Sequence, residues 1–375
     1  MRLLWTELDR FRNLKKQKVY LHPRFNLLVG RNGQGKTNFL EAVGYLGTLK
    51  SFRSASRFEM IEHDADMCRV AGRFENGQTG WTASFSLAHD GRTQFLDEKR
   101  IPSPDKYLGW SGIVSFIPED VALVSGSPSS RRKAVDRAIF QKTDGYAVEY
   151  RKFLRVLRNR NALLRNPRAS HEEWKSWTRS LSGAASLIVR HRVRLLSEIS
   201  PHMERIGKDL GLDGKLTLDY QPSFRLENNA SKEDVTEALY EGFLIAKKRD
   251  MDARHTTVGP HRDDICFVLG GQSLARYGSQ GQKRTAILTF KLSIAQVLKD
   301  TRGTYPLVLL DDVASELDET RRRALGTLIS EIDAQFVVTT TGDDYMFLSD
   351  RKGYVMTVED GKIEKTGNEG EQNFG

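Results

Sequence analysis

An eight-residue stretch near the N-terminus matches the phosphate-binding pattern G-x-x-x-x-G-K-[ST] at every fixed position: Gly30-Arg31-Asn32-Gly33-Gln34-Gly35-Lys36-Thr37. The apolar run from Phe25 to Val29 before it predicts a buried strand. The residues after it predict a helix, because apolar side chains recur there at helical spacing: Phe39, Leu40, Val43 and Leu46. The motif therefore stands in the strand–loop–helix context that a phosphate-binding loop requires.

The residue types in this loop have a chemical rationale. Glycines let backbone N–H groups turn toward phosphate oxygens at a helix N-terminus, which already favours an anion. Lys36 is expected to reach the β- and γ-phosphates, and the Thr37 hydroxyl to hold Mg²⁺. The alternative is a glycine-rich turn without a ligand, against which the flanking strand and helix argue. We therefore expect the chain to bind a nucleoside triphosphate.

A second piece of this site follows the apolar run Leu307-Val308-Leu309-Leu310, which ends in Asp311 and Asp312. On a strand beside the phosphate-binding loop, Asp311 would hold Mg²⁺ through water. Asp312 would lie near the γ-phosphate, where a base or water-orienting group is needed. The alternative is a strand that ends in a pair of solvated carboxylates. The presence of a phosphate-binding loop in the same chain argues against this alternative.

A third piece is Gly278-Ser279-Gln280-Gly281-Gln282, which opens a predicted helix just under thirty residues before the carboxylate strand. Serine and glycine at a helix start can be a simple cap. ATPases of the ABC class, however, carry their signature sequence at this position, where it binds the γ-phosphate of ATP held by a second subunit. The three pieces in this order predict an ATP site that two chains complete together.

The composition suits a globular protein that binds a polyanion. Of the 375 residues, 39% are hydrophobic and 29% charged, and 58 Lys+Arg against 49 Asp+Glu give a formal net charge of +9. Such a balance favours nucleic acid first and an anionic membrane second. Two distant cysteines, no apolar run near eighteen residues and no signal peptide lead us to expect a cytoplasmic protein without a membrane partner.

The pattern along the chain predicts three regions. Residues 1–125 form the first part of an ATPase head, in which alternating residues from about 67 to 101, with Asn76-Gly77 and Asp90-Gly91 turns, predict an antiparallel meander. Residues 126–250 form a helical lobe that starts at Ser127-Pro128, with one helix ending or bending at Pro201. Residues 251–375 return to the head, with strands near 265–269, 305–312, 335–341 and 353–358.

Several further stretches are distinctive, and in them the chain resembles the RecF family of bacterial recombination-repair ATPases, which is related to SMC proteins. The 259–264 and 310–318 stretches are the most specific, and Lys50 departs from the arginine usual in the family. The matching stretches are Gly30 to Asn38, Lys50-Ser51-Phe52-Arg53, Phe116-Ile117-Pro118-Glu119-Asp120, Gly126-Ser127-Pro128, Arg131-Arg132 with Asp136, Arg160-Asn161-Ala162-Leu163-Leu164, Gly259-Pro260-His261-Arg262-Asp263-Asp264, Ser279-Gln280-Gly281-Gln282, and Leu310-Asp311-Asp312-Val313 with Ser315-Glu316-Leu317-Asp318.

The resemblance implies an α/β fold, a P-loop ABC-type ATPase head with a mixed sheet and an antiparallel meander, plus an inserted helical lobe. That lobe would be a shortened SMC coiled coil, since about 240 residues between Thr37 and Ser279 are too few for a long one. The implied partners are a second copy of the chain in an ATP-dependent homodimer, double-stranded DNA near single-strand gaps, and RecR. With RecR, the dimer would help to load RecA on gapped DNA.

Motif and resemblance together give a set of expected site residues. The cofactors are ATP and Mg²⁺. Asp318 is expected in the loop that faces the other subunit of the dimer. The expected catalytic residues are Lys36, Asp311 and Asp312; Thr37 and Asp311 are expected to hold the metal; and the expected ATP-binding residues are Gly30, Arg31, Asn32, Gly33, Gln34, Gly35, Lys36, Thr37, Asn38, Ser279, Gly281, Gln282 and Asp318.

The sequence also predicts slow hydrolysis. Members of the wider class with fast turnover carry Glu where Asp312 stands here, and often a His after the following strand. Here that strand ends Val338-Thr339-Thr340-Thr341, without a His. An aspartate side chain is one methylene shorter than glutamate and reaches less far, so we expect slow ATP hydrolysis. Hydrolysis would open the dimer, and its slow rate would set how long the dimer stays closed.

No stretch resembles a base-reading helix, so DNA contact is expected to be mainly phosphate contact. For each of the basic residues taken alone, a solvated position on a helix surface is better supported than DNA contact. His261 could be a site residue, but we favour packing or an orienting role. The candidates for phosphate contact are Arg53, Arg57, Lys99, Arg100, Arg131, Arg132, Arg151, Arg155 and Arg158.

Three other functions agree less well with the sequence. An ABC transporter ATPase subunit would be shorter, would carry a clear glutamine loop and switch His, and would lack the helical lobe. A nucleotide-gated structural adaptor would bind ATP with only incidental hydrolysis. A nuclease of the overcoming-lysogenization type would need an acidic metal-binding domain, which we do not find in the sequence.

Overall fold

The computed structural model of the chain describes residues 1–53, 56–101, 112–166, 168, 170–227, 231–315, 317–341 and 352–366. It divides into two compact units. The first comprises Met1–Val121, Arg205–Asp213 and Ser279–Gly375, and the second Ala122–Glu204 and Gly214–Gly278. Residues 251–278, which we expected in the ATPase head, belong to the second unit because β10 (Asp264–Leu269) pairs with β9 (Leu216–Gln221) there.

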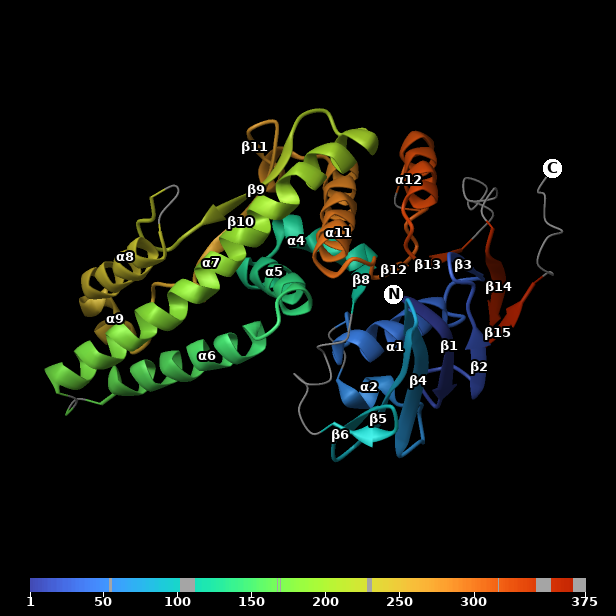
Figure 1. Cartoon of the computed structure of the whole chain (residues 1–375), viewed down its shortest axis with the longest axis horizontal. Helices are drawn as coiled ribbons and strands as arrows, with labels where there is room; N and C mark the ends of the chain where they lie inside the picture. Colours follow the sequence, from blue (N-terminus) through green and yellow to red (C-terminus); the bar gives the residue numbers. More distant parts are fainter. Residues whose placement is uncertain are drawn as a thin grey trace. The chain divides into compact units, whose positions relative to one another are not determined.

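The first unit contains an antiparallel six-stranded sheet in the order β2-β1-β4-β5-β6-β7 (Figure 1). Its strands are β1 (Arg2–Asp9), β2 (Gln17–Tyr20), β4 (Met67–Asn76), β5 (Thr79–Ala88), β6 (Arg92–Leu96) and β7 (Lys99–Arg100). The predicted meander over 67–101 is confirmed as β4 to β7, and Gly77 adopts a left-handed φ of 60° in the first hairpin turn.

The second sheet of this unit carries the predicted strand before the phosphate-binding loop. Its order is β15-β14-β3-β13-β12-β8, and all neighbours except β15 and β14 are parallel. The strands are β3 (Phe25–Val29), β8 (Ile113–Phe116), β12 (Leu307–Leu310), β13 (Phe336–Thr340), β14 (Tyr354–Glu359) and β15 (Lys362–Lys365). β12 is therefore not the direct neighbour of β3, because β13 lies between them.

Helix α1 (Lys36–Thr48) lies between the two sheets and shares one hydrophobic core with both. Its side chains Phe39, Leu40, Val43 and Leu46 are fully buried, as the helical spacing predicted. The other helical elements of this unit are α2 (Arg57–Met60), a 3₁₀ turn (Pro118–Val121), α11 (Gln280–Arg302) and α12 (Glu319–Glu331). Burial on both sides fixes α1, and with it the loop that precedes it.

The second unit is mainly helical, as predicted for the inserted lobe. Its elements are α4 (Ala122–Ser125), α5 (Pro128–Lys142), α6 (Tyr146–Leu163), most of α7 (His171–Asp209), α8 (Lys232–Ile245), α9 (Lys247–Ala253), α10 (Leu274–Tyr277), and the sheet β11-β10-β9 with β11 (Gln272–Ser273). Ser127 caps α5 by accepting from the Ser130 N–H, as the Ser-Pro pair predicted.

α7 does not end at Pro201. A proline inside a helix removes one backbone hydrogen bond and strains the turn before it. Ile199 and Met203 are nevertheless fully buried on either side of it. Tertiary packing of this apolar face outweighs the local cost, as it does for most helices in proteins.

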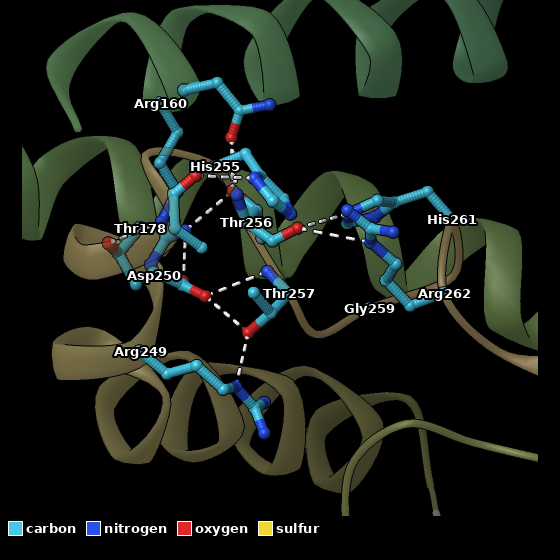
Figure 2. A network of polar contacts seen from close by, with 12 residues as sticks. Arg160, Thr178, Arg249, Asp250, His255, Thr256, Thr257, Gly259, His261 and Arg262 are labelled. Carbon is cyan, nitrogen blue, oxygen red and sulfur yellow. Dashed lines mark hydrogen bonds and ion pairs between the residues drawn. The ribbon is translucent and has the colours of Figure 1, made fainter. Parts of the chain in front are cut away.

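A buried polar network joins α6, α7 and α9 in the second unit (Figure 2). The Arg160 side chain is fully buried and donates from Nη1 to Asp250 Oδ2 at 2.8 Å and to Thr256 Oγ1 at 2.7 Å, and from Nε to Thr178 Oγ1. Asp250 in turn accepts from the backbone and hydroxyl of Thr257. Such a network is costly to break, since either partner left alone would be an unpaired buried charge.

The 259–264 stretch continues this network. Pro260 O accepts from Arg192, whose other donors form a bidentate pair with Asp136 at 2.8 and 2.9 Å. Asp264 accepts a bidentate pair from Arg131 at 2.7 and 2.8 Å. The 259–264 stretch therefore ties helices to β10, and its role in this structure is packing.

His261 belongs to the same network, as we favoured from the sequence. Its Nε2 donates to Thr256 O at 3.0 Å, while Nδ1 is buried without a hydrogen-bond partner among the described residues. Burial lowers the pKa of His261 from 6.5 to about 4, and the Arg262 and Arg132 charges add to this, whereas the Thr256 hydrogen bond and Asp263 oppose it. The side chain is a neutral, packed imidazole at neutral pH.

This burial predicts a pH dependence of stability. Between pH 6.5 and about 4 the unfolded chain binds a proton that the folded chain excludes, so stability is lost as the pH falls. From pH 7 to pH 5 we expect His261 to remove about 2 kcal/mol from the free energy of unfolding. Denaturant unfolding of wild type and His261→Gln at both pH values measures this loss, which the variant should lack.

The matched control is His63→Gln, because the His63 side chain is 93% exposed. That variant should keep the wild-type pH dependence. An equal pH dependence in wild type and His261→Gln would contradict the assignment of a buried neutral imidazole.

Candidate nucleotide-binding site

The phosphate-binding loop joins β3 to α1, as its sequence predicted. Gly33 and Gly35 have left-handed φ values of 80° and 118°, which non-glycine residues adopt only with strain. Gly35 occupies the N-cap of α1 and no side chain caps the helix, so the first N–H groups of α1 remain available to a ligand. Arg31, Asn32 and Gly33 are exposed. An uncapped helix N-terminus behind a glycine-rich turn fits a bound phosphate chain.

The C-terminal hairpin β14–β15 holds one side of this loop. A Cβ at Gly30 would lie 2.4 Å from Val358 O, so close packing against β14 requires glycine there. The hairpin turn donates from Asp360 N to Gln34 Oε1 at 2.6 Å and from Gly361 N to Gln34 O at 3.0 Å. Gln34 thus fixes the loop to the sheet.

Two asparagines hold the other side. Asn13 Nδ2 donates to Gly33 O at 3.2 Å, and Asn38 Nδ2 donates to Asn13 Oδ1 at 2.7 Å. Asn38 also accepts from Arg53 Nη1 at 2.9 Å, so the basic turn at 50–53 reaches the first turn of α1. Asn38, which we expected to bind ATP, is engaged with protein groups in this structure.

A buried glutamate on α1 determines where that basic turn lies. The Glu41 carboxylate is fully buried and forms a bidentate pair with Arg12, with distances of 2.5 and 3.1 Å. The Ser51 hydroxyl donates to the same carboxylate. Sequence reasoning missed Glu41 and Arg12, although a charged residue within the apolar run of α1 was an available signal. Arg53, a candidate for DNA contact, is therefore held beside the phosphate-binding loop.

Lys36 is 6% exposed and donates from Nζ to Gly30 O at 2.5 Å and to Arg31 O at 2.8 Å. Burial lowers the pKa of its ammonium group, while the nearby Asp312 and Asp311 carboxylates oppose that shift. Its long flexible stem carries a point charge within the loop. The cation therefore lies where the motif requires it, between the loop backbone and the carboxylates.

Asp311 follows β12 and meets the phosphate-binding loop directly. It is 4% exposed, and its Oδ1 accepts from Thr37 Oγ1 at 2.9 Å. Burial raises the pKa of Asp311, whereas hydrogen bonds from Thr339 and Thr37 and the charge of Arg53 oppose this. A hydroxyl beside one carboxylate suits Mg²⁺, which keeps several waters and takes its other ligands from phosphates. Among the described residues, no cluster of three His, Cys, Asp or Glu side chains could hold a metal ion by itself.

Thr339 is a site residue that sequence reasoning missed. It is fully buried at the end of β13, donates to Asp311 Oδ1 at 2.7 Å, and accepts the Asp312 N–H at 2.9 Å. The residue pair Leu310 and Val338 precedes Asp311 and Thr339 in the parallel register. The signal for this contact in the sequence was weak. Asp311 and Thr339 both lie at the carboxyl ends of apolar strands, and the carboxyl ends of parallel strands share one edge of a sheet.

Asp312 differs from Asp311 in its surroundings. Its backbone has a left-handed φ of 46°, and its Oδ2 accepts from Ser315 Oγ at 2.8 Å. Its Oδ1 is buried and has no hydrogen-bond partner among the described residues. A buried carboxylate oxygen without a partner calls for an explanation. A water or nucleophile to be oriented next to the γ-phosphate would supply one.

The signature stretch forms a closed cap at the start of α11. Ser279 N donates to Gln282 Oε1 at 2.9 Å and Gln282 N donates to Ser279 Oγ at 3.2 Å, which is a capping box. Ser279 is exposed. In the part of the chain that the structure describes, Ser279, Gly281 and Gln282 make no hydrogen bond or ion pair with the phosphate-binding loop, Asp311 or Asp312. Asp318 is the N-cap of α12, where its side chain accepts from the Arg321 N–H.

The basic candidates for DNA contact fall into two groups. Arg131 is buried with its guanidinium paired to Asp264, and Arg132 donates to Asp263 O. The side chains of both residues are therefore engaged with protein groups in this structure. The exposed members are Arg53, Arg57, Lys99, Arg100, Arg151, Arg155 and Arg158.

Within the described ranges, no helix is both long and apolar enough to cross a membrane.

Known proteins similar to this chain agree with these features. The family model described as RecF/RecN/SMC N terminal domain matches residues 3–364. A DNA replication and repair protein RecF of Anaeromyxobacter sp. (strain Fw109-5) is 36% identical over 343 residues, which are 91% of this chain and 92% of that protein. The chain belongs to the RecF family. A second member, RecF of Myxococcus xanthus (strain DK1622), is 34% identical over 374 residues and covers 96% of this chain and 98% of its own.

Solved structures confirm the predicted fold class. The structure described as the recombination mediator protein RecF-ATP in the RecFOR pathway has a TM-score of 0.88 at 29% identity, and the match covers 98% of each chain. An SMC head bound to the C-winged helix domain of ScpA has a TM-score of 0.58 at 19% identity, covers 99% of each chain and shares the fold. This RecF-family chain is thus an ATPase of the ABC and SMC type with an inserted helical lobe.

The contacts of Thr339 predict a selective effect on the metal side of the site. Thr339→Val keeps the shape but removes both hydrogen bonds, and residues that orient a metal ligand typically change metal affinity about 10- to 100-fold. We expect roughly tenfold weaker Mg²⁺ binding to the ATP-bound chain. A Mg²⁺ titration of the complex with a fluorescent ATP analogue measures this.

Thr339→Ser should restore the affinity, because it keeps the hydroxyl. The matched control is Thr340→Val at the neighbouring buried position, whose side chain lies outside this set of contacts. Equal Mg²⁺ affinity in wild type and Thr339→Val would show that Thr339 does not orient Asp311.

Proposed function

We propose that this protein is an ATP-dependent DNA clamp of replication-gap and recombinational repair. It binds ATP, dimerises on ATP, and binds double-stranded DNA near junctions with single strands. It then hydrolyses ATP slowly and helps a RecR-type partner to load RecA. The relatives named as DNA replication and repair proteins, and the ATP-bound RecF of the RecFOR pathway, support this assignment.

The observation that carries the proposal is how the predicted ATP ligands are distributed over the chain. Lys36, Thr37 and Asp311 lie together, whereas among the described residues the signature turn at 279–282 makes no hydrogen bond or ion pair with them. A helix N-terminus with an exposed serine is suited to bind a phosphate presented by another molecule. Two copies related by a two-fold axis would each lend the signature turn to the other, so that two ATP molecules join the dimer.

Bound Mg²⁺ and ATP would supply the reacting phosphate and a charge that stabilises the leaving group. Lys36 and the N–H groups of α1 bind the phosphates, and Thr37 and Asp311 hold the metal. Asp312 orients the attacking water through its partnerless Oδ1. The short Asp312 side chain makes this step slow. The ATP-bound dimer therefore persists until hydrolysis removes the γ-phosphate contact and allows the two copies to separate.

DNA binding relies on phosphate contacts by exposed basic side chains. Arg151, Arg155 and Arg158 lie on α6, and Lys99 and Arg100 on β7. Contacts of this kind release counterions, so affinity for duplex DNA falls steeply as salt rises. A protein with this function acts in the cytoplasm on nucleoid DNA and needs no membrane partner.

The proposal predicts that ATP decides the oligomeric state. Wild type should sediment as a dimer with ATP and Mg²⁺ and as a monomer with ADP. Lys36→Ala should remain a monomer with ATP, because it loses a cation at the phosphates. Asp312→Asn should hydrolyse ATP at no more than about one hundredth of the wild-type rate, and it should remain a dimer. Sedimentation velocity and phosphate release measure both properties.

Lys18→Ala serves as the control, because Lys18 is an exposed lysine on β2, outside the site. A monomeric Asp312→Asn with ATP would contradict the proposal. Turnover measured with and without gapped duplex DNA separates the alternatives. Stimulation of ATP turnover by DNA supports the clamp. ATP binding without turnover would favour a nucleotide-gated adaptor. Fast ATP turnover without DNA would favour a transporter-type ATPase.

A further inference from the structure

The Arg321 side chain connects two segments that sequence reasoning treated separately. Its Nη1 lies 2.7 Å from Asp318 Oδ2. The same nitrogen lies 3.1 Å from the position that a Cβ on Gly281 would occupy. The guanidinium therefore lies against the first turn of α11 and at the same time holds the carboxylate that caps α12.

The geometry leaves Arg321 little freedom. Asp318 accepts from the Arg321 backbone N–H at 2.9 Å through one oxygen and from the guanidinium through the other. The Arg321 side chain is only 23% exposed, whereas that of Asp318 is 53% exposed. Gly281 has no side chain to push the guanidinium away, and its φ is not in the left-handed region. A side chain at position 281 would therefore have to displace the Arg321 guanidinium slightly.

We propose that Arg321 is a positioning residue that fixes the Asp318 loop against the signature turn, so that both meet a second copy as one preformed surface. This inference rests on the proposed ATP-dependent dimer, because only there do the two segments act together. A partly exposed ion pair contributes little to the stability of a single chain. Its effect would be to lower the ordering cost when two copies associate.

α12 offers a matched comparison two residues further on. Arg323 forms an ion pair with Glu319 on the same helix, but their side chains are 75% and 70% exposed. The two arginines share the helix and the charge, and each pairs with an acidic residue at the start of α12. They differ in that Arg321 also lies against Gly281. Arg323→Ala therefore removes a similar ion pair without touching the signature turn.

The experiment compares Arg321→Ala, Arg321→Lys and Arg323→Ala with wild type in the full chain. With the slowly hydrolysed analogue ATPγS and Mg²⁺, Arg321→Ala should weaken dimerisation about tenfold. Nucleotide affinity of the monomer, measured at dilutions below dimerisation, should be unchanged because the phosphate-binding loop is intact. Arg321→Lys should recover part of the effect, and Arg323→Ala should behave as wild type.

A second measurement does not depend on dimerisation. Without nucleotide, hydrogen exchange of the Gln282 and Lys283 amides, which are hydrogen-bonded to Ser279, should accelerate in Arg321→Ala and not in Arg323→Ala. Unchanged exchange and unchanged dimerisation would overturn the role of Arg321. A wild type that stays monomeric with ATPγS, even if exchange responds as expected, would overturn the proposed function and with it this role in assembly.

Discussion

The hydrogen bond from Thr37 Oγ1 to Asp311 Oδ1 joins residues 274 positions apart in the chain, and the nucleotide site depends on it. It forms because β3 and β12 are parallel strands of one sheet, so that the segments after them meet at the same edge. β13 lies between these strands, and Thr339 at its end contacts both Asp311 and Asp312. Burial of α1 between two sheets then holds Thr37 in place. Packing far from the phosphates thus sets the geometry of the site.

In the second unit, the residues that are most distinctive in the sequence serve packing. Its most distinctive stretch, residues 259–264, binds Arg131 and Arg192 and contains a neutral buried His261. Arg131, Arg160 and Arg192 are buried and paired, so part of the positive charge counted in the sequence serves the fold and is withheld from any polyanion. A buried ion pair resists substitution because a single remaining partner is costly. A sequence signature can therefore identify a family without marking a catalytic site.

Much of the fold was predictable, and the reasons are local. The glycines of the phosphate-binding loop, the Ser127 cap and the alternating residues of β4 and β5 each specify their own conformation. What sequence reasoning missed depends on distant neighbours. β9 pairs with β10 across more than forty residues. Of the two outcomes expected at Pro201, an end or a bend of the helix, an end is excluded because α7 continues with buried side chains on either side. Thr339, Glu41 and Arg321 acquire their roles only through contacts with other segments, which no spacing along the chain encodes.

In the proposed function, each ATP site combines the phosphate-binding loop of one copy with the signature turn of another. The most direct test mixes two inactive variants, Lys36→Ala, which damages the loop, and Ser279→Arg, which blocks the turn. A mixed dimer then holds one intact site, whereas two copies of the same variant can form none. We expect each variant alone to be inactive and the equimolar mixture to recover ATP turnover, up to about half of wild type when all chains are in mixed dimers. A mixture that stays as inactive as its components would contradict the claim.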